Sequence, residues 1–169
     1  KRRIYFIAKS FIVGFPQLPR DELGRSTSAV LVGDFVLMAD ATWKYIDILP
    51  DKSQLTSEAQ GELPSQTQLN KLVAVHPGVG KEASAAAAYI NNTDNVFVVE
   101  DMKGNYRVLG NDKWTTKATV AQDLGQGATG TTSTTINVEA TDEVPAPFYV
   151  GKLDTEDGEI DCATGDTQP

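Results

Sequence analysis

The stretch LNKLVAVHPGVGKEASAAAAYINNTDNVFVVEDMKGNYRVLG, residues 69–110, contains the clearest structural signals in the sequence. It begins with a β-rich run, and an alanine-rich segment with the highest helix propensity of the chain follows. Asn91-Asn92 marks the end of that segment, because Asn tolerates the left-handed conformation that closes many helices. Two valine-rich runs then flank a turn containing Gly104. We therefore expect a strand, one helix over about 81–91 and a β-hairpin over 95–109.

Short β-rich runs dominate the rest of the sequence, and turn residues separate them. They cover residues 28–32, 35–38, 42–48, 115–120, 131–140 and 148–150. Many strands with a single helix predict a mainly β fold, either an antiparallel β-sandwich or a partly closed barrel with one flanking α-helix. We expect its core to contain Trp43, Tyr45, Phe97, Val99 and Val108.

Charge is distributed unevenly along the chain. Residues 1–25 contain six Lys or Arg and two acids, a net charge of +4, whereas residues 139–169 contain nine acids and a single lysine, a net charge of −8. One interpretation is a solvated acidic tail with a chance cluster of cations. The other is electrostatic complementarity between neighbouring copies, which would align them during assembly.

Changes in composition divide the chain into three segments. Residues 50–68 are polar, lack a helical stripe and contain Pro64, so we expect a long loop there. The acidic end has few large apolar residues and is expected to be weakly ordered. The predicted organisation is a basic N-terminal arm or strand (1–27), a β-sandwich domain with the long loop (28–151) and an acidic C-terminal tail (152–169).

The size and charge of the chain exclude several classes of protein. Its 169 residues fit one domain that needs neither disulfides nor a metal to fold. A net charge of −8 disfavours general binding of nucleic acids, which requires cations opposite the phosphates. The sequence contains no run of 18 apolar residues, which a transmembrane helix would need, so we expect no membrane partner. The apolar run Ile4–Ala8 follows three cations but is short for a signal peptide, and we expect a strand.

Few residues suggest catalysis or metal binding. The single Cys162 and single His76 exclude sites built from several histidines or paired thiols. Residues 77–81 resemble a phosphate-binding loop only superficially, and the acidic stretch 154–161 lacks the carboxylates of an EF-hand at both ends of the loop. We predict no cofactor, no metal and no enzymatic activity. A hydrolase using paired carboxylates ranks third among the functions considered.

Two stretches resemble the tail tube proteins of long-tailed bacteriophages and related prophage elements. The first is residues 69–110, with its strand, alanine-rich helix and hairpin. The second is residues 127–151, a threonine-rich strand that leads to Pro145-Ala146-Pro147-Phe148-Tyr149. The resemblance covers about residues 28–151 and consists of an order of elements and some turn residues. The basic N-terminal segment and the acidic tail have no clear counterpart in that family.

The resemblance implies a virion structural protein assembled in the cytoplasm of a bacterial host. The subunit would form stacked rings, expected to be hexamers, with itself and with other virion tail proteins as partners. DNA would pass through the channel without specific binding, and acidic walls would repel its phosphates. A tail terminator or a capsid accessory protein is an alternative virion component.

Contacts between subunits are expected in three segments. The N-terminal arm and the long loop are able to reach a neighbour, since the entropic cost of closing a loop grows slowly with its length. Open edge strands of a small sandwich also need partners, and ring formation would supply them. The residues predicted to make these contacts are Arg2 and Arg3 in the arm, Leu55, Gln60 and Glu62 in the loop, and Lys103 and Asn105 in the hairpin turn.

A different class of function is a secreted β-sandwich module that binds carbohydrate. Its candidate residues are Trp43, Trp114 and Tyr106, because aromatic rings on strands or turns stack on sugars. The alternative is that these rings belong to the core.

Overall fold

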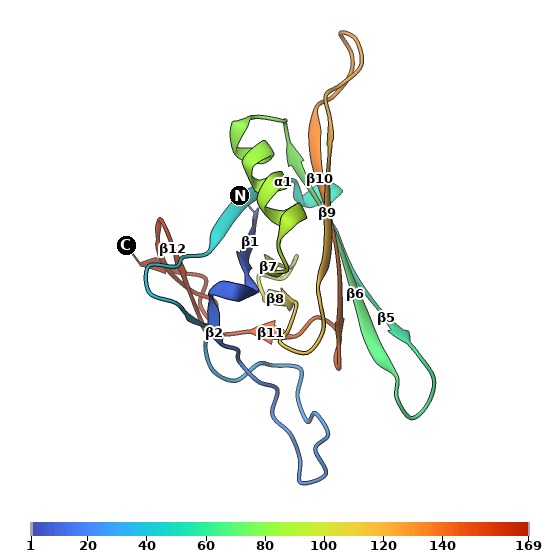
Figure 1. The fold of residues 1–169 in the computed structure, drawn as a ribbon, viewed down its shortest axis with the longest axis vertical. Coiled ribbons are helices and arrows are strands. Elements are labelled where there is room, and N and C mark those ends of the chain that lie inside the picture. Colours follow the sequence, from blue (N-terminus) through green and yellow to red (C-terminus); the bar gives the residue numbers. More distant parts are fainter. Residues whose placement is uncertain (1, 169) are drawn as a thin grey trace.

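A computed structural model describes residues 2–168 of the chain. Its centre is a five-stranded antiparallel sheet in the order β11-β8-β7-β1-β4 (Figure 1). The strands are β1 (Arg2–Ala8), β4 (Lys44–Ile48), β7 (Asn95–Glu100), β8 (Tyr106–Leu109) and β11 (Phe148–Tyr149). The hairpin expected over 95–109 is confirmed as β7 and β8, and Gly104 has φ +86° in its turn.

Strand β1 lies between β7 and β4 and is covered on both faces. Its apolar run explains this position, because side chains alternate across a strand. Ile4 and Phe6 point into one apolar cluster, while Tyr5 and Ile7 point into another. The strand expected for this apolar run is present, and it is an interior strand of the main sheet rather than an arm.

A second antiparallel sheet has four strands in the order β5-β6-β10-β9. They are β5 (Gln54–Gln60), β6 (Thr67–Pro77), β10 (Ser133–Asp142) and β9 (Lys117–Asp123). The long loop expected over 50–68 is wrong, since this segment contains a 3-10 turn (Pro50–Lys52) and strand β5. Strand β5 lies at the sheet edge and is mostly exposed, so its polar side chains need no apolar partners.

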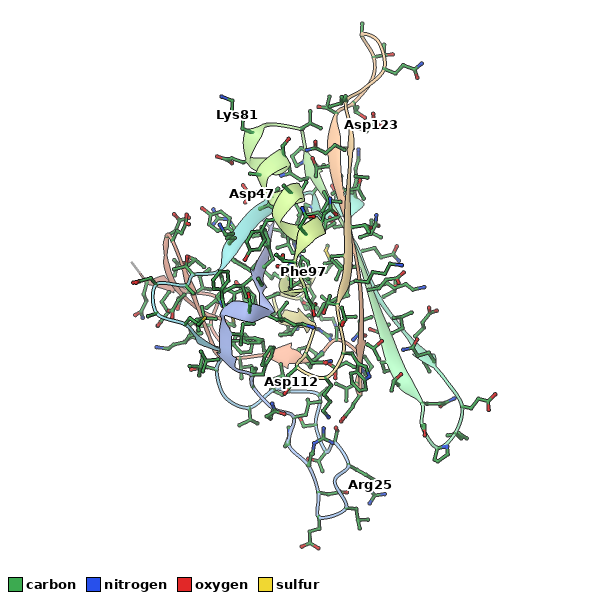
Figure 2. The ribbon with its side chains drawn as sticks, viewed as in Figure 1. Arg25, Asp47, Lys81, Phe97, Asp112 and Asp123 are labelled. Carbon is green, nitrogen blue, oxygen red and sulfur yellow. The ribbon has the colours of Figure 1, made fainter. Side chains whose placement is uncertain are left out.

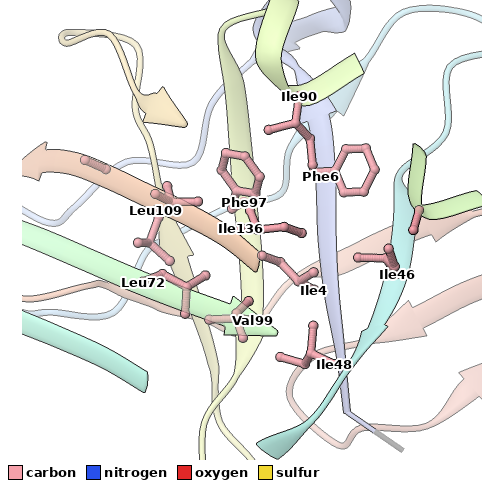
Figure 3. Packing of buried hydrophobic residues seen from close by; sticks show 14 residues of the cluster. Ile4, Phe6, Ile46, Ile48, Leu72, Ile90, Phe97, Val99, Leu109 and Ile136 are labelled. Carbon is pink, nitrogen blue, oxygen red and sulfur yellow. The ribbon is translucent and has the colours of Figure 1, made fainter. Parts of the chain in front are cut away.

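The main core fills the space between the two sheets (Figure 3). Ile4 and Phe97 come from the five-stranded sheet, Leu72 and Ile136 from the four-stranded sheet, and Ile90 from the helix. All five side chains are almost fully buried. At about 25 cal/mol per Å² of apolar surface, such burial stabilises the fold by roughly 1.5–3 kcal/mol for each large side chain.

The expected helix is present as α1 (Lys81–Asn92). Ala83 and Ile90 form its buried contacts with the core, and its alanine-rich surface permits close packing. The Asn91 side chain accepts a hydrogen bond from the Val120 N–H at 2.9 Å, which joins the end of the helix to strand β9. Figure 1 shows the helix beside the upper part of the four-stranded sheet.

A second cluster covers the opposite face of the five-stranded sheet. It includes Trp43, Val108 and Tyr149, together with side chains from the small elements. These elements are a 3-10 turn (Lys9–Phe11), β2 (Ile12–Gly14) with β3 (Val36–Leu37), and a three-stranded sheet of β12 (Lys152–Thr155), β13 (Gly158–Asp161) and β14 (Thr167–Gln168). The five-stranded sheet therefore has an apolar cluster on each face, and the expected core residues divide between the two clusters.

The expectation of a weakly ordered acidic tail is wrong. Residues 152–168 form the three-stranded sheet, and Leu153, Ile160 and Cys162 are buried against the second cluster. The main-chain N–H of Trp43 donates to the Asp154 carbonyl at 2.8 Å, which ties this small sheet to the chain just before β4. Three buried apolar residues are enough to hold this small sheet in place, because they pack on an apolar surface formed by the rest of the chain.

The fold is mainly β with antiparallel sheets and a single helix, as the sequence predicts, and within residues 2–168 the sheets do not close into a barrel. The expected core residues are buried except Tyr45, which is half-buried. The run 28–32 forms isolated bridges rather than a full strand. Among the described residues, no helix has the length and apolar content needed to span a bilayer.

Three segments project from the two-layer body (Figure 1). They are the turn 61–66 between β5 and β6, the turn 124–132 between β9 and β10, and the loop 15–30. Figure 2 places Arg25 near the far end of the loop and Asp123 below the turn between β9 and β10. Each projection exposes a leucine, with Leu23, Leu63 and Leu124 between 73% and 84% accessible.

Candidate functional site

A groove of about 380 Å³ opens where the two sheets meet. It brings together the start of β1, the segment 50–57 and the turn between β7 and β8. Its lining residues are Arg2, Ile48, Pro50, Ser53, Gln54, Leu55, Ser57, Leu72, Val99, Glu100, Asp101, Met102, Arg107, Pro145 and Ala146. The three segments in which the sequence predicts contacts between subunits therefore border one groove.

The floor of this groove is apolar. Leu72 and Val99 are buried at its base, and Leu55 packs against the same cluster from strand β5. Met102 stands on the rim with 73% of its surface accessible. An apolar floor with an exposed methionine at its edge is suited to bind an apolar side chain from another molecule.

The turn between β7 and β8 is held rigid beside the groove. Asp101 accepts hydrogen bonds from the Lys103 and Asn105 N–H groups at 2.8 and 3.0 Å, and Arg107 Nε lies 3.2 Å from its other oxygen. Burial alone would raise the pKa of Asp101, but these hydrogen bonds outweigh burial and lower the pKa. Of the predicted contact residues, Lys103 and Asn105 thus lie in a turn that is already shaped.

Two arginines lie in the groove wall, and of these Arg107 pairs with a carboxylate whereas Arg2 does not among the described residues. Arg107 pairs with Asp101, donates to the Ala146 carbonyl at 3.0 Å and stacks 3.6 Å from the centre of the Phe148 ring. Arg2 donates from Nη1 to the Glu100 carbonyl at 3.3 Å. Within residues 2–168, Arg2 makes no ion pair with a carboxylate, so its charge remains available at the rim.

Arg3 is committed inside the chain. Its Nε lies 3.0 Å from Asp47, its Nη1 lies 3.8 Å from Asp157, and its guanidinium lies 4.1 Å from the centre of the Tyr45 ring. Asp157 belongs to the acidic C-terminal segment. Part of the charge complementarity between the two ends of the sequence is therefore used within one molecule.

The remaining predicted contact residues lie along the hairpin of β5 and β6. The Gln60 side chain donates to Thr67 and Thr141 hydroxyls, both at 3.2 Å, and so braces the base of the turn against β10. Glu62 is exposed in the turn itself. Lys71 and Glu58 pair at 3.0 Å across the hairpin. The outer edge of β5 has no strand beside it among the described residues.

His76 and Cys162 have structural surroundings. His76 Nδ1 lies 2.6 Å from the Asp47 carbonyl oxygen, which fixes the ring between β6 and β4. Burial raises the pKa of the Cys162 thiol to about 12, so the reactive thiolate is suppressed. No three His, Cys, Asp or Glu side chains gather in a metal-binding group anywhere in the described part of the chain.

The aromatic residues considered for carbohydrate binding do not form a shared surface. Trp43 is 1% exposed and Tyr106 is 7% exposed, so both rings belong to the core. Trp114 keeps 37% of its surface accessible. One partly exposed ring remains from the three candidates.

Sequence reasoning missed Arg107 and Glu143. Glu143 accepts Arg20 at 2.8 Å, Lys113 at 2.6 Å and the Ser26 hydroxyl at 2.8 Å. It thereby fastens the loop 15–30 to the end of β10. Both residues gain their roles from partners far away in the chain, so no local pattern distinguishes them.

Comparisons with protein-family models, with curated proteins and with solved structures found no match to this chain.

Proposed function

We propose that this chain is a structural subunit of a phage or prophage virion, in which it acts as a tail tube protein. Copies associate into stacked rings around a channel for DNA. The observation that supports self-association best is the groove bordered by Arg2, Leu55 and Met102, since these come from the three segments predicted to make contacts. The resemblance in the order of elements supplies the virion context.

Open sheet edges also support self-association. Strand β5 is seven residues long, and the outward N–H and C=O groups of its alternate residues have no strand partner within residues 2–168. A polar edge of this length invites pairing with a second chain. The ion pair between Glu58 of β5 and Lys71 lies at the surface and contributes little to stability on its own.

Overall charge favours passage of DNA over binding. A net charge of −8 for each subunit is repeated around a ring, and a negatively charged wall repels phosphates. Such a channel lets a duplex slide without stable contacts. We expect that adding general polyanions to the assembled protein leaves its sedimentation unchanged.

A tail terminator or capsid accessory protein is the neighbouring alternative, and it would form one ring without stacking. A carbohydrate-binding module remains the alternative from another class. Trp114 is the residue that would carry sugar stacking. A glycan array with the Trp114→Ala variant as control tests this possibility, because only specific stacking disappears in the variant.

Sedimentation velocity over a wide concentration range, combined with negative-stain microscopy, tests the proposal. Rings or tubes that grow with concentration are expected for a tube subunit, whereas single rings indicate a terminator. A strictly monomeric particle at the highest concentration, in the salt conditions that phages tolerate, would overturn the proposal.

A further inference from the structure

The hairpin of β5 and β6 contributes to the groove at one end and exposes a leucine at the other. Its start, around Leu55 and Ser57, lines the groove. Its far end is the turn 61–66, which exposes Leu63 over 84% of its surface. We call residues 61–66 the tip. Only residues 58–60 of β5 separate Ser57 in the groove from the tip, which is roughly 13 Å of extended chain between Ser57 and Gly61.

The tip presents one apolar side chain beside one negative charge. Glu62 and Leu63 are adjacent and both exposed, and Glu62 is the sole charged residue between 61 and 66. The Ser65 N–H donates to the Glu62 carbonyl at 2.8 Å, so the turn is closed before any partner binds. A shaped turn loses less conformational entropy on docking than a flexible one.

The groove offers the complementary pair. Leu55, Leu72 and Val99 form an apolar floor, and Arg2 at the rim lacks a carboxylate partner among the described residues. Arg107 cannot take that role, because Asp101 already occupies it. An incoming leucine would be buried on the floor while an adjacent carboxylate pairs with Arg2.

The two other projecting leucines fit this groove less well. Leu23 follows Glu22, but two arginines and two acids within residues 20–25 leave that part of the loop without net charge. Leu124 follows Asp123, whose carboxylate accepts the Gly125 N–H at 2.9 Å. That turn also contains three glycines, so ordering it costs more backbone entropy.

The geometry points to a docking contact between two copies of this chain, in which the Glu62-Leu63 tip of one enters the Arg2–Leu55–Met102 groove of the next. This inference rests on the self-association proposed above and specifies its surfaces. Because tip and groove lie at opposite ends of one hairpin, each docked copy keeps a free tip or a free groove. Such a head-to-tail contact closes into a ring or continues as a filament.

Cross-linking between two variants that each carry one added cysteine tests the contact directly. Leu63→Cys protein is mixed with Met102→Cys protein under mild oxidation; both sites are exposed, so both variants should fold. A disulfide requires the two Cα atoms within about 7 Å, so a mixed dimer on a non-reducing gel reports docking. Leu124→Cys mixed with Met102→Cys is the matched control, and the native Cys162 is buried.

Each outcome has a separate meaning. A 63–102 dimer without a 124–102 dimer supports the inference, whereas the reverse pattern, or none with assembly intact, overturns the inference and leaves self-association standing. Failure of the wild-type protein to associate removes both proposals.

A second measurement avoids engineered cross-links. We expect Leu63→Ser to raise the concentration needed for assembly roughly ten- to hundredfold, since docking buries a leucine side chain, while Leu124→Ser and Leu23→Ser change it little. Equal effects of all three substitutions would contradict a contact specific to the tip.

Discussion

Glu143 fastens the loop 15–30 to the body, and its removal should loosen that loop measurably. Its carboxylate contacts Arg20, Ser26 and Lys113 within 2.8 Å. The side-chain hydrogen bond from Arg20 has the largest effect, and together with Lys113 it lowers the pKa of Glu143 from 4.5 to about 2 despite partial burial. Taken at face value, this difference corresponds to roughly 3 kcal/mol of stabilisation at neutral pH.

Solvent reduces that figure. The Glu143 side chain is 25% accessible, and water screens ion pairs near a surface. We therefore expect Glu143→Gln to lower the free energy of unfolding by about 1–2 kcal/mol at pH 7. Glutamine keeps the size and one acceptor of glutamate, so the loss reports the charge. Trypsin should also cut faster after Arg20 and Arg25.

The direction of the pKa shift determines how the stabilisation by Glu143 changes with pH. A carboxylate whose pKa is lower in the folded state stabilises the fold above its ordinary value of 4.5 and loses this effect as the pH falls towards 2. The neighbouring Asp142 has its pKa raised, mainly by burial, and is present in both proteins, so its contribution is largely shared.

Denaturant unfolding of wild type and Glu143→Gln at pH 7 and near pH 2 supplies the comparison, with Glu139→Gln as control. Glu139 is an exposed acid on β10, the strand that ends just before Glu143, and has no ion pair among the described residues. The difference at pH 7 should vanish near pH 2. No difference at pH 7, or one that persists unchanged at pH 2, would refute the reasoning.

Two further substitutions and one thiol reaction test the packing of buried residues. Phe97→Ala should cost about 3–5 kcal/mol by urea unfolding, because its buried ring leaves a cavity between the sheets; a cost below about 1 kcal/mol would mean that the layers collapse together. Gly110→Ala should cost about 1–3 kcal/mol, since φ is +117° and a Cβ would lie 2.8 Å from Thr116 Oγ1; unchanged thermal unfolding would show that the turn relaxes. Cys162 should react with a thiol reagent only after unfolding, since burial raises its pKa to about 12; fast reaction of folded protein at pH 8 would contradict this.

Local signals made part of the fold predictable. The alanine-rich run of α1 and the Gly104 turn act over neighbouring residues, so both elements follow from short stretches of sequence. Strand β5 was missed because an edge strand obtains its stability from backbone hydrogen bonds with β6 and needs no apolar alternation. The C-terminal sheet was missed because Leu153, Ile160 and Cys162 acquire their burial from distant partners.

The groove was predictable only in its parts. Arg2, Leu55 and the hairpin turn were each expected to make contacts, but no sequence pattern places them together. Their meeting depends on the register Arg2↔Ile48 and Ile4↔Val99, which pairs residues 46 and 95 positions apart. Contacts of such long range follow from the assembled sheets rather than from any local preference.

The interior position of β1, between β4 and β7, has a consequence for synthesis of the chain. Residues 2–8 are synthesised long before one of their two neighbours, β7, which is complete only at residue 100. Strand β4, complete at residue 48, offers one neighbour earlier, but the other edge of the apolar segment Ile4–Ala8 stays unpaired until residue 100 has been made. A nascent strand with an open apolar edge is prone to aggregate, so this protein should depend on chaperones during its synthesis.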